Sequence, residues 1–167
     1  PTFFGANPAD AALNGGSALR PIGNVEDLAR DLVRSLSDQQ RDTAILADQA
    51  PKDILTLNTP AVAEEYHPRD QLDGTDPALF ETVRYTPKPK GLDAAGMQEP
   101  QREILHALIT EYIHRMPDVI AQIESDRLDR RGLDGIHLAW SGGIEKRQGH
   151  YYRLQGPRFL VEYDNIQ

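Results

Sequence analysis

Polar side chains that could do chemistry lie among aromatic residues between Gly135 and Asn165. This stretch holds the chain's only tryptophan, Trp140, and three of its six tyrosines. An arginine here could hold a substrate carboxylate or phosphate, and a glutamate could act as a base or a metal ligand. The candidate catalytic residues are His137, His150, Tyr151, Arg153 and Glu162. The candidate substrate-binding residues are Trp140, Ser141, Tyr152 and Asp164.

The alternation of side chains along two strands predicts which of these residues meet. If the hairpin turn lies at Gly156–Pro157, Tyr151 and Arg153 share one face of the sheet with Glu162, and His150 lies on the other face. The first face then has two interpretations. It is either the polar floor of a pocket or a solvent-exposed face carrying a cross-strand Arg153–Glu162 ion pair.

Two further patterns also allow a structural and a chemical interpretation. Ser141 precedes two glycines after a strand, which fits a nucleophile or an anion-binding nest of amides, but also a simple turn beside a buried Trp140. The chain lacks the Gly-x-Ser-x-Gly elbow of serine hydrolases at this point. Asp48 and Asp53 flank Ala50-Pro51, where turn and capping roles are favoured over a paired-carboxylate site.

The elements that must position these residues follow from the apolar periodicity. A helix is predicted from residue 24, with one apolar stripe formed by Leu28, Leu32, Val33 and Leu36. Ser37 and Gln40 match a capping box, which predicts the start of a second helix. Ile45 and Leu46 are expected on the apolar side of that second helix. Helices are also predicted over 99–115, with Pro100 in the first turn, and over 118–131, with Val119, Ile120, Ile123 and Leu128 facing inward. Strands are predicted over 136–140, 150–154 and 159–163.

The region between residues 57 and 92 has no clear periodicity and is predicted to be a long loop or cover segment. Six of the twelve prolines fall between Pro51 and Pro89, and Val83 with Tyr85 suggests a brief extended piece. A stretch of this length is too long for an ordinary connection. The whole pattern predicts an α+β fold over residues 1–167: a small antiparallel sheet, helices packed mainly on one face, and a long Pro-rich loop.

Bulk composition limits the classes of partner. A chain of 167 residues suits one domain with a real core. Its net charge of −8, without a stripe of Lys or Arg, argues against nucleic-acid binding. The sequence has no apolar run long enough for a membrane span. It has no cysteine, so disulfides and thiolate chemistry are excluded.

Several stretches resemble the thirty-five-hundred family of bacterial domains of unknown function, specifically its C-terminal half. They are FFGANPA, NVEDLARDLVRSLSDQQR, APKDIL, HLAWSGG and HYYRLQGPRFLVEYDNIQ, which together extend over nearly the whole chain. The resemblance implies further N- and C-terminal parts, export to an extracytoplasmic compartment, and a His-x-His pair beyond the last residue. With such a pair, His150 and Glu162 would complete a set of ligands for a divalent metal. The family implies no reaction.

Three hypotheses follow for function. The first is an exported bacterial enzyme, hydrolytic or metal-assisted, acting on a small molecule in a pocket formed by the C-terminal strands. The second is a non-catalytic module whose Trp140 and tyrosines stack on a sugar or another flat ligand. The third is a structural half that supports a site elsewhere in a longer protein.

Overall fold

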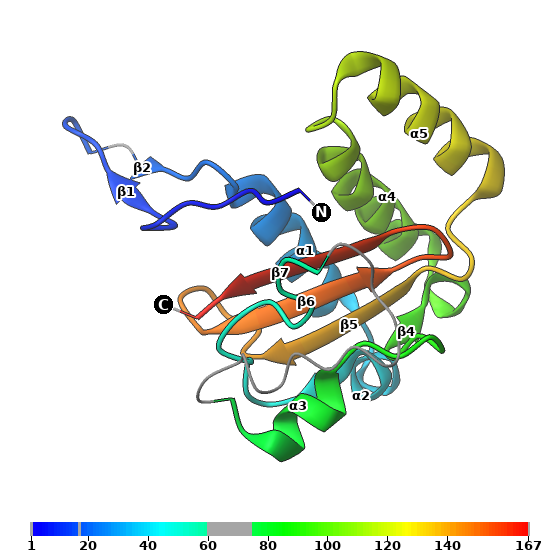
Figure 1. Cartoon of the computed structure of the whole chain (residues 1–167), viewed down its shortest axis with the longest axis horizontal. Coiled ribbons are helices and arrows are strands. Elements are labelled where there is room, and N and C mark those ends of the chain that lie inside the picture. The colour runs from blue at the N-terminus through cyan, green and yellow to red at the C-terminus, as the bar shows by residue number, and fades with distance from the viewer. Residues whose placement is uncertain (1, 17, 60–74, 167) are drawn as a thin grey trace.

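The computed structural model describes residues 2–16, 18–59 and 75–166. A mixed sheet lies at its centre (Figure 1). Its strands are β3 (Ile45–Ala47), β4 (Leu92–Asp93), β5 (His137–Gly142), β6 (His150–Gln155) and β7 (Leu160–Asn165). The order is β3-β5-β6-β7, and β4 also pairs with β5. All pairings are antiparallel except that of β3 with β5, which is parallel.

The helices surround this sheet, and a small hairpin projects from it. The helices are α1 (Gly23–Ser35), α2 (Asp38–Ala44), α3 (Pro77–Val83), α4 (Glu99–Ile113), α5 (Asp118–Arg131) and the short 3-10 helix η2 (Ala94–Gly96). The hairpin strands are β1 (Ala11–Ala12) and β2 (Ala18–Leu19). Figure 1 shows this hairpin extending away from the sheet, and α5 beside α4. No helix among the described residues is long and apolar enough to cross a membrane.

The main core lies between one face of the sheet and helices α1 and α4. Leu32 and Val33 of α1, and Leu105 and Leu108 of α4, are fully buried there, with Trp140 of β5 among their neighbours in the core. Leu32 and Val33 confirm the predicted apolar stripe of α1. The capping box that begins α2 is also confirmed, because Ser37 accepts the Gln40 amide and Gln40 accepts the Ser37 amide.

A second, smaller core covers the opposite face. Leu55, Phe80 and Val83 pack there against Tyr151 of β6. Phe80 and Val83 belong to α3, so the segment predicted over 57–92 contains a helix, and Val83 ends that helix instead of lying in an extended piece. Residues 60–74 of this segment lie outside the described residues.

Two other predictions on helical faces are wrong. Ile45 and Leu46 do not continue α2 but form β3, whose pairing with β5 overrides the helical pattern. On α5, Val119, Ile120 and Ile123 are 73%, 46% and 42% exposed instead of facing inward. The α+β class is confirmed.

Candidate functional site

The predicted site residues of β6 and β7 divide between the two faces of the sheet. Arg153 pairs with Glu162 and His150 with Asn165, so the predicted hairpin register is confirmed. Tyr151, Arg153 and Glu162 therefore point away from α1, whereas His150 points toward it. The sheet itself separates these two groups of side chains.

The helix-facing group is a closed aromatic stack. The ring of Trp140 lies 5.0 Å from that of His150 and 6.0 Å from that of Tyr152, nearly parallel to both. Tyr163 stacks on His150 and Tyr152 from the other side. Trp140, Tyr152 and His150 are 0% exposed, so these rings bind one another and offer no face to a ligand. The predicted stacking role of Trp140 and Tyr152 is therefore corrected to a core role.

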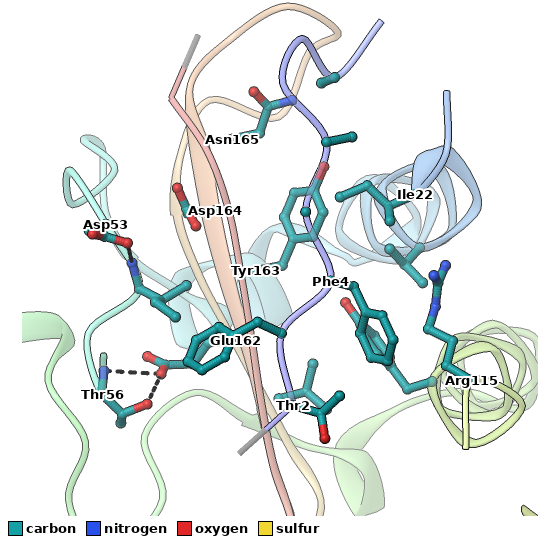
Figure 2. Close-up of a pocket in the computed structure, with 18 of the residues that line it drawn as sticks. Thr2, Phe4, Ile22, Asp53, Thr56, Arg115, Glu162, Tyr163, Asp164 and Asn165 are labelled. Carbon is teal, nitrogen blue, oxygen red and sulfur yellow. Dashed lines mark hydrogen bonds between the residues drawn. The ribbon is translucent and has the colours of Figure 1, made fainter. Parts of the chain in front are cut away.

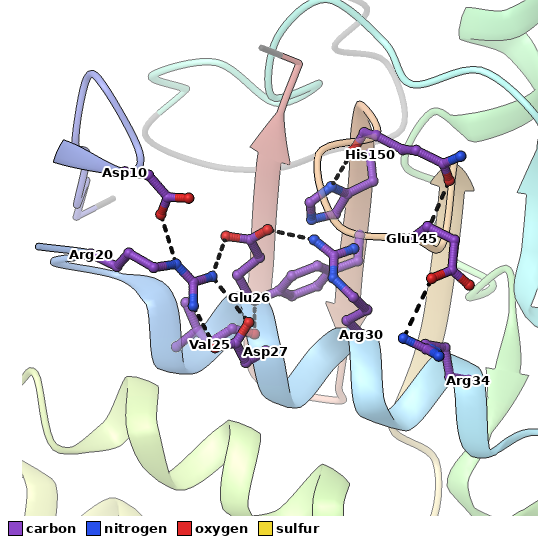
Figure 3. A network of polar contacts seen from close by, with 11 residues as sticks. Asp10, Arg20, Val25, Glu26, Asp27, Arg30, Arg34, Glu145 and His150 are labelled. Atoms are coloured by element: carbon purple, nitrogen blue, oxygen red, sulfur yellow. Dashed lines mark hydrogen bonds and ion pairs between the residues drawn. The ribbon is translucent and has the colours of Figure 1, made fainter. Parts of the chain in front are cut away.

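A polar network centred on the buried Glu26–Arg30 pair of α1 lies against this stack (Figure 3). Glu26 accepts hydrogen bonds from Arg20 and Arg30, and Arg20 also contacts Asp10 and Asp27. The bond from Arg20 lowers the pKa of Asp27. This network joins the N-terminal hairpin to α1.

His150 lies inside the same buried region. Its Nδ1 lies 3.0 Å from the Gln148 carbonyl, and its Nε2 has no hydrogen-bond partner among the described residues. Burial lowers the pKa of His150, because the charged ring would lose its hydration. Such a neutral, enclosed histidine has a structural role.

On the opposite face, Glu162 is held by four donors (Figure 2). The amides of Leu55 and Thr56 each lie 3.1 Å from its carboxylate, the Tyr151 hydroxyl lies at 2.6 Å, and the Thr56 hydroxyl also donates. Charge-assisted bonds of this kind fix the position of a carboxylate. Glu162 thereby anchors the part of the chain after β3 that contains Leu55 and Thr56, the Leu55 segment, to the sheet.

Arg153 is not the ion-pair partner predicted for Glu162. It is fully buried, and its Nη1 donates to the Val83 carbonyl at 2.6 Å. Lys90 donates to the carbonyls of Glu81 and Thr82 in the same last turn of α3. Two cations thus meet the negative end of α3. The solvent-exposed interpretation of this face is wrong, because α3 and the Leu55 segment cover it.

A pocket of about 620 Å³ opens along β7, the last strand of the sheet order. The N-terminal residues Thr2–Asn7 run beside β7 and form one wall. Asp53, Glu162 and Asp164 lie together on the side of β7 that faces the Leu55 segment, as Figure 2 shows. Tyr163 and Phe4 line the helix-facing side.

Asp164 has an unusual environment within this pocket. Burial, together with the nearby charges of Asp53 and Glu162, raises the pKa of Asp164 to about 6. Its carboxylate has no hydrogen bond to another described residue, in contrast to Glu162. The two carboxylates therefore differ in their hydrogen bonding, and Asp164 keeps its proton to a higher pH than an ordinary aspartate, as a general acid requires.

Two predicted residues lie away from this pocket. Ser141 is buried, and its hydroxyl donates to the Gln49 carbonyl, so it ties β5 to the segment after β3. His137 stands at the other end of β5, with Nε2 3.7 Å from Asp93. Neither lines the β7 pocket.

The predicted pair of metal ligands does not form one site. His150 and Glu162 lie on opposite faces of the sheet, so a single ion cannot contact both side chains. Among the residues that the structure describes, no group of three or more His, Asp or Glu side chains is placed to hold a metal ion.

Two residues from outside the C-terminal strands, Asp53 and Phe4, also line the pocket. Asp53 was assigned to a turn, and its carboxylate does accept the Ile54 amide at 2.7 Å, but it also faces Asp164. The spacing of Asp53 and Thr56 matches no known motif, so only the fold shows that these residues lie beside β7.

Comparison with known proteins supports membership of a family without assigning a reaction. No curated protein matches the chain, and no solved structure matches it. A family model matches residues 1–167 over their full length, in agreement with the resemblance of the C-terminal motifs. The chain belongs to the family described as "Protein of unknown function (DUF3500)".

Proposed function

We propose that this protein is a hydrolytic enzyme whose acid–base chemistry takes place in the β7 pocket. The observation that carries the proposal is the contrast between two carboxylates on one face of one strand. Glu162 is saturated by four donors, whereas Asp164 has none from other described residues and a raised pKa. Two positions along a strand are about 6.6 Å apart, which leaves room for a scissile bond near both.

Asp164 is the proton donor in this scheme. Its pKa of about 6 keeps the carboxyl group protonated in mildly acidic solution, where it can protonate a leaving group. Glu162 has its lone pairs engaged, so it acts as a fixed negative charge beside the reacting centre. Asp53 is exposed at the pocket wall and is the carboxylate free to accept a proton from water.

The lining of the pocket favours a neutral or cationic substrate. Asp53 and Glu162 place negative charge on one side of the pocket, which repels an anion. Phe3 and Phe4 line the same pocket with 55% and 45% of their surface exposed. Exposed rings of this kind stack on the flat faces of sugars and similar ligands. These rings also support a second candidate, a non-catalytic module that binds such ligands.

The test is hydrolysis of chromogenic glycosides, esters and amides between pH 4 and 8 by the wild type, Asp164→Asn and Asp42→Asn. Asp42 is an exposed carboxylate on α2 and serves as the matched control. We expect a rate that falls above pH 6 as Asp164 loses its proton, and a loss of about 100-fold or more in Asp164→Asn. Asp42→Asn should match the wild type.

Two results would decide against the enzyme. Turnover that survives in Asp164→Asn would remove Asp164 from the chemistry. No turnover in any class, together with sugar binding that is lost in Phe4→Ala, would favour the binding module instead.

A further inference from the structure

A second pocket, of about 470 Å³, lies between α4, α5 and the turn that joins β6 to β7. Its walls are mainly apolar: α4 contributes Ile109 and Ile113, α5 contributes Ile120 and Leu128, and the turn before β7 contributes Phe159. Its volume is within the range of small-molecule sites. It shares Tyr112, Leu160 and Val161 with the β7 pocket, so the two cavities adjoin across one wall.

Helix α5 leaves apolar surface open at this pocket. Only Ala121 and Leu128 of α5 are buried, whereas Ile120 is 46% exposed and Met116, just before the helix, is 39% exposed. Both exposed side chains line the pocket. Exposed apolar side chains gathered around a concave site are typical of ligand binding.

The charges at the pocket are not balanced. Glu124 is paired with Arg127, and Asp134 is paired with Arg102. Arg131 and Arg158 also line the pocket, are exposed, and have no acidic partner among the described residues. Two uncompensated guanidinium groups therefore stand at an apolar cavity in a chain whose net charge is −8.

We propose that this pocket binds a long-chain carboxylate, that is, a free fatty acid. The hydrocarbon chain would lie against Ile113, Ile120 and Phe159 and need no polar partner there. The carboxylate would be held by Arg131 or Arg158, whose planar forks suit bidentate contact with a carboxylate. The proposal does not rest on the acid–base chemistry of the β7 pocket.

The test is calorimetric titration of laurate, below its micelle concentration, into the whole chain. We expect saturable binding of one laurate per chain. The double variant Arg131→Gln/Arg158→Gln should weaken binding by about tenfold or more, which corresponds to about 1.4 kcal/mol. Arg130→Gln is the matched control, because this arginine is on the same exposed helix end but does not line the pocket.

Two further measurements test the apolar part and the charged part of the site one at a time. Ile120→Glu should abolish laurate binding while circular dichroism stays unchanged, because Ile120 is half exposed and its replacement leaves the core intact. Dodecyltrimethylammonium, which has the same chain and the opposite charge, should bind more weakly than laurate.

Several outcomes would overturn the proposal. They are absence of laurate binding, equal affinity in the Arg131/Arg158 double variant, and equal affinity for the cationic surfactant. A dimer that Ile120→Glu converts to a monomer, without laurate binding, would identify the face as an interface between copies of this chain.

Discussion

At the residue scale, Glu162 carries the contacts that hold the second face of the sheet together. It joins two segments that are more than a hundred positions apart, because the amides of Leu55 and Thr56 both donate to its carboxylate. The Tyr151 hydroxyl completes the site from the neighbouring strand, and burial raises the pKa of that hydroxyl, so it remains a donor. A negative charge is the acceptor that these four donors require.

We predict that Glu162→Gln loosens the segment around Leu55. An amide offers one neutral oxygen in place of a charged pair, and a hydrogen bond to a charged group contributes about 1.5–3 kcal/mol. The free energy of unfolding should therefore fall by about 2 kcal/mol, and the amide protons of Leu55 and Thr56 should exchange faster with solvent. Hydrogen-exchange NMR and urea unfolding measure both effects. Glu103→Gln, at an exposed position of α4, should change neither; protection at Leu55 and Thr56 equal to the wild type would contradict the prediction.

At the element scale, the sequence predicts best where an element's own pattern decides its structure. The capping box at Ser37, the start of α4 near Pro100 and the end of α5 before Gly132 were all predicted, because caps and breakers act within one turn. The β6–β7 register was predicted as well, because alternation and a tight turn determine it together.

The remaining elements depend on contacts that are distant in sequence. Ile45 leaves the helical pattern because β5 offers it a parallel partner at Trp140. A solvent-exposed pair is one of the two interpretations that the sequence leaves open for Arg153 and Glu162, but α3 and the Leu55 segment cover these side chains. The predicted site residues are divided for the same reason: alternation correctly separated His150 from Glu162, while no local pattern shows which face a later segment will cover.

We predict that Gly91→Ala disrupts the junction between β4 and β5. Gly91 has a φ of +97°, and a Cβ there would lie 2.1 Å from the Leu138 carbonyl oxygen, which is backbone and has little freedom to move. Gly15 is a matched control, because its φ is +103° and a Cβ there meets open space.

Both alanine variants carry the strain of a positive φ, about 1 kcal/mol, but only Gly91→Ala adds the clash. We therefore expect Gly91→Ala to cost at least about 3 kcal/mol and Gly15→Ala about 1 kcal/mol. Urea unfolding measures the difference. Equal losses in the two variants would show that the backbone of β5 yields without cost.

At the scale of the whole molecule, the sheet is enclosed by two cores that contain charged groups. Arg30 and Glu26 lie under α1 against the aromatic stack, and Arg153 lies under α3 on the other face. Nε and Nη1 of Arg30 have no hydrogen-bond partner among the described residues. Because buried charged groups without full pairing are costly, a change in protonation near them should change the stability of the fold.

Two groups should act on the pH dependence of unfolding with opposite signs. Asp164 has a folded pKa of about 6, which is above its unfolded value near 3.9. Between these two pH values the folded state binds more protons than the unfolded chain. The contribution of Asp164 to stability therefore increases as the pH falls from about 6 to about 3.9. His150 has a folded pKa below its unfolded value near 6.5. The unfolded chain then binds the extra proton, and stability from His150 is lost as the pH falls below about 6.5.

We predict that His150→Phe removes this acid-dependent loss. A phenyl ring can keep the stacking with Trp140 and Tyr163, but it takes up no proton beside Arg30. The wild type should therefore lose stability relative to His150→Phe as the pH falls from 7 to 5, by up to about 1.4 kcal/mol per pH unit. Urea unfolding at several pH values measures this difference, with His114→Phe, at an exposed position, as the matched control. Parallel pH profiles for the wild type and His150→Phe would contradict this prediction. They would mean that His150 takes up its proton as readily in the folded protein as in the unfolded chain. Water or a counter-charge would then have to reach the ring inside the core.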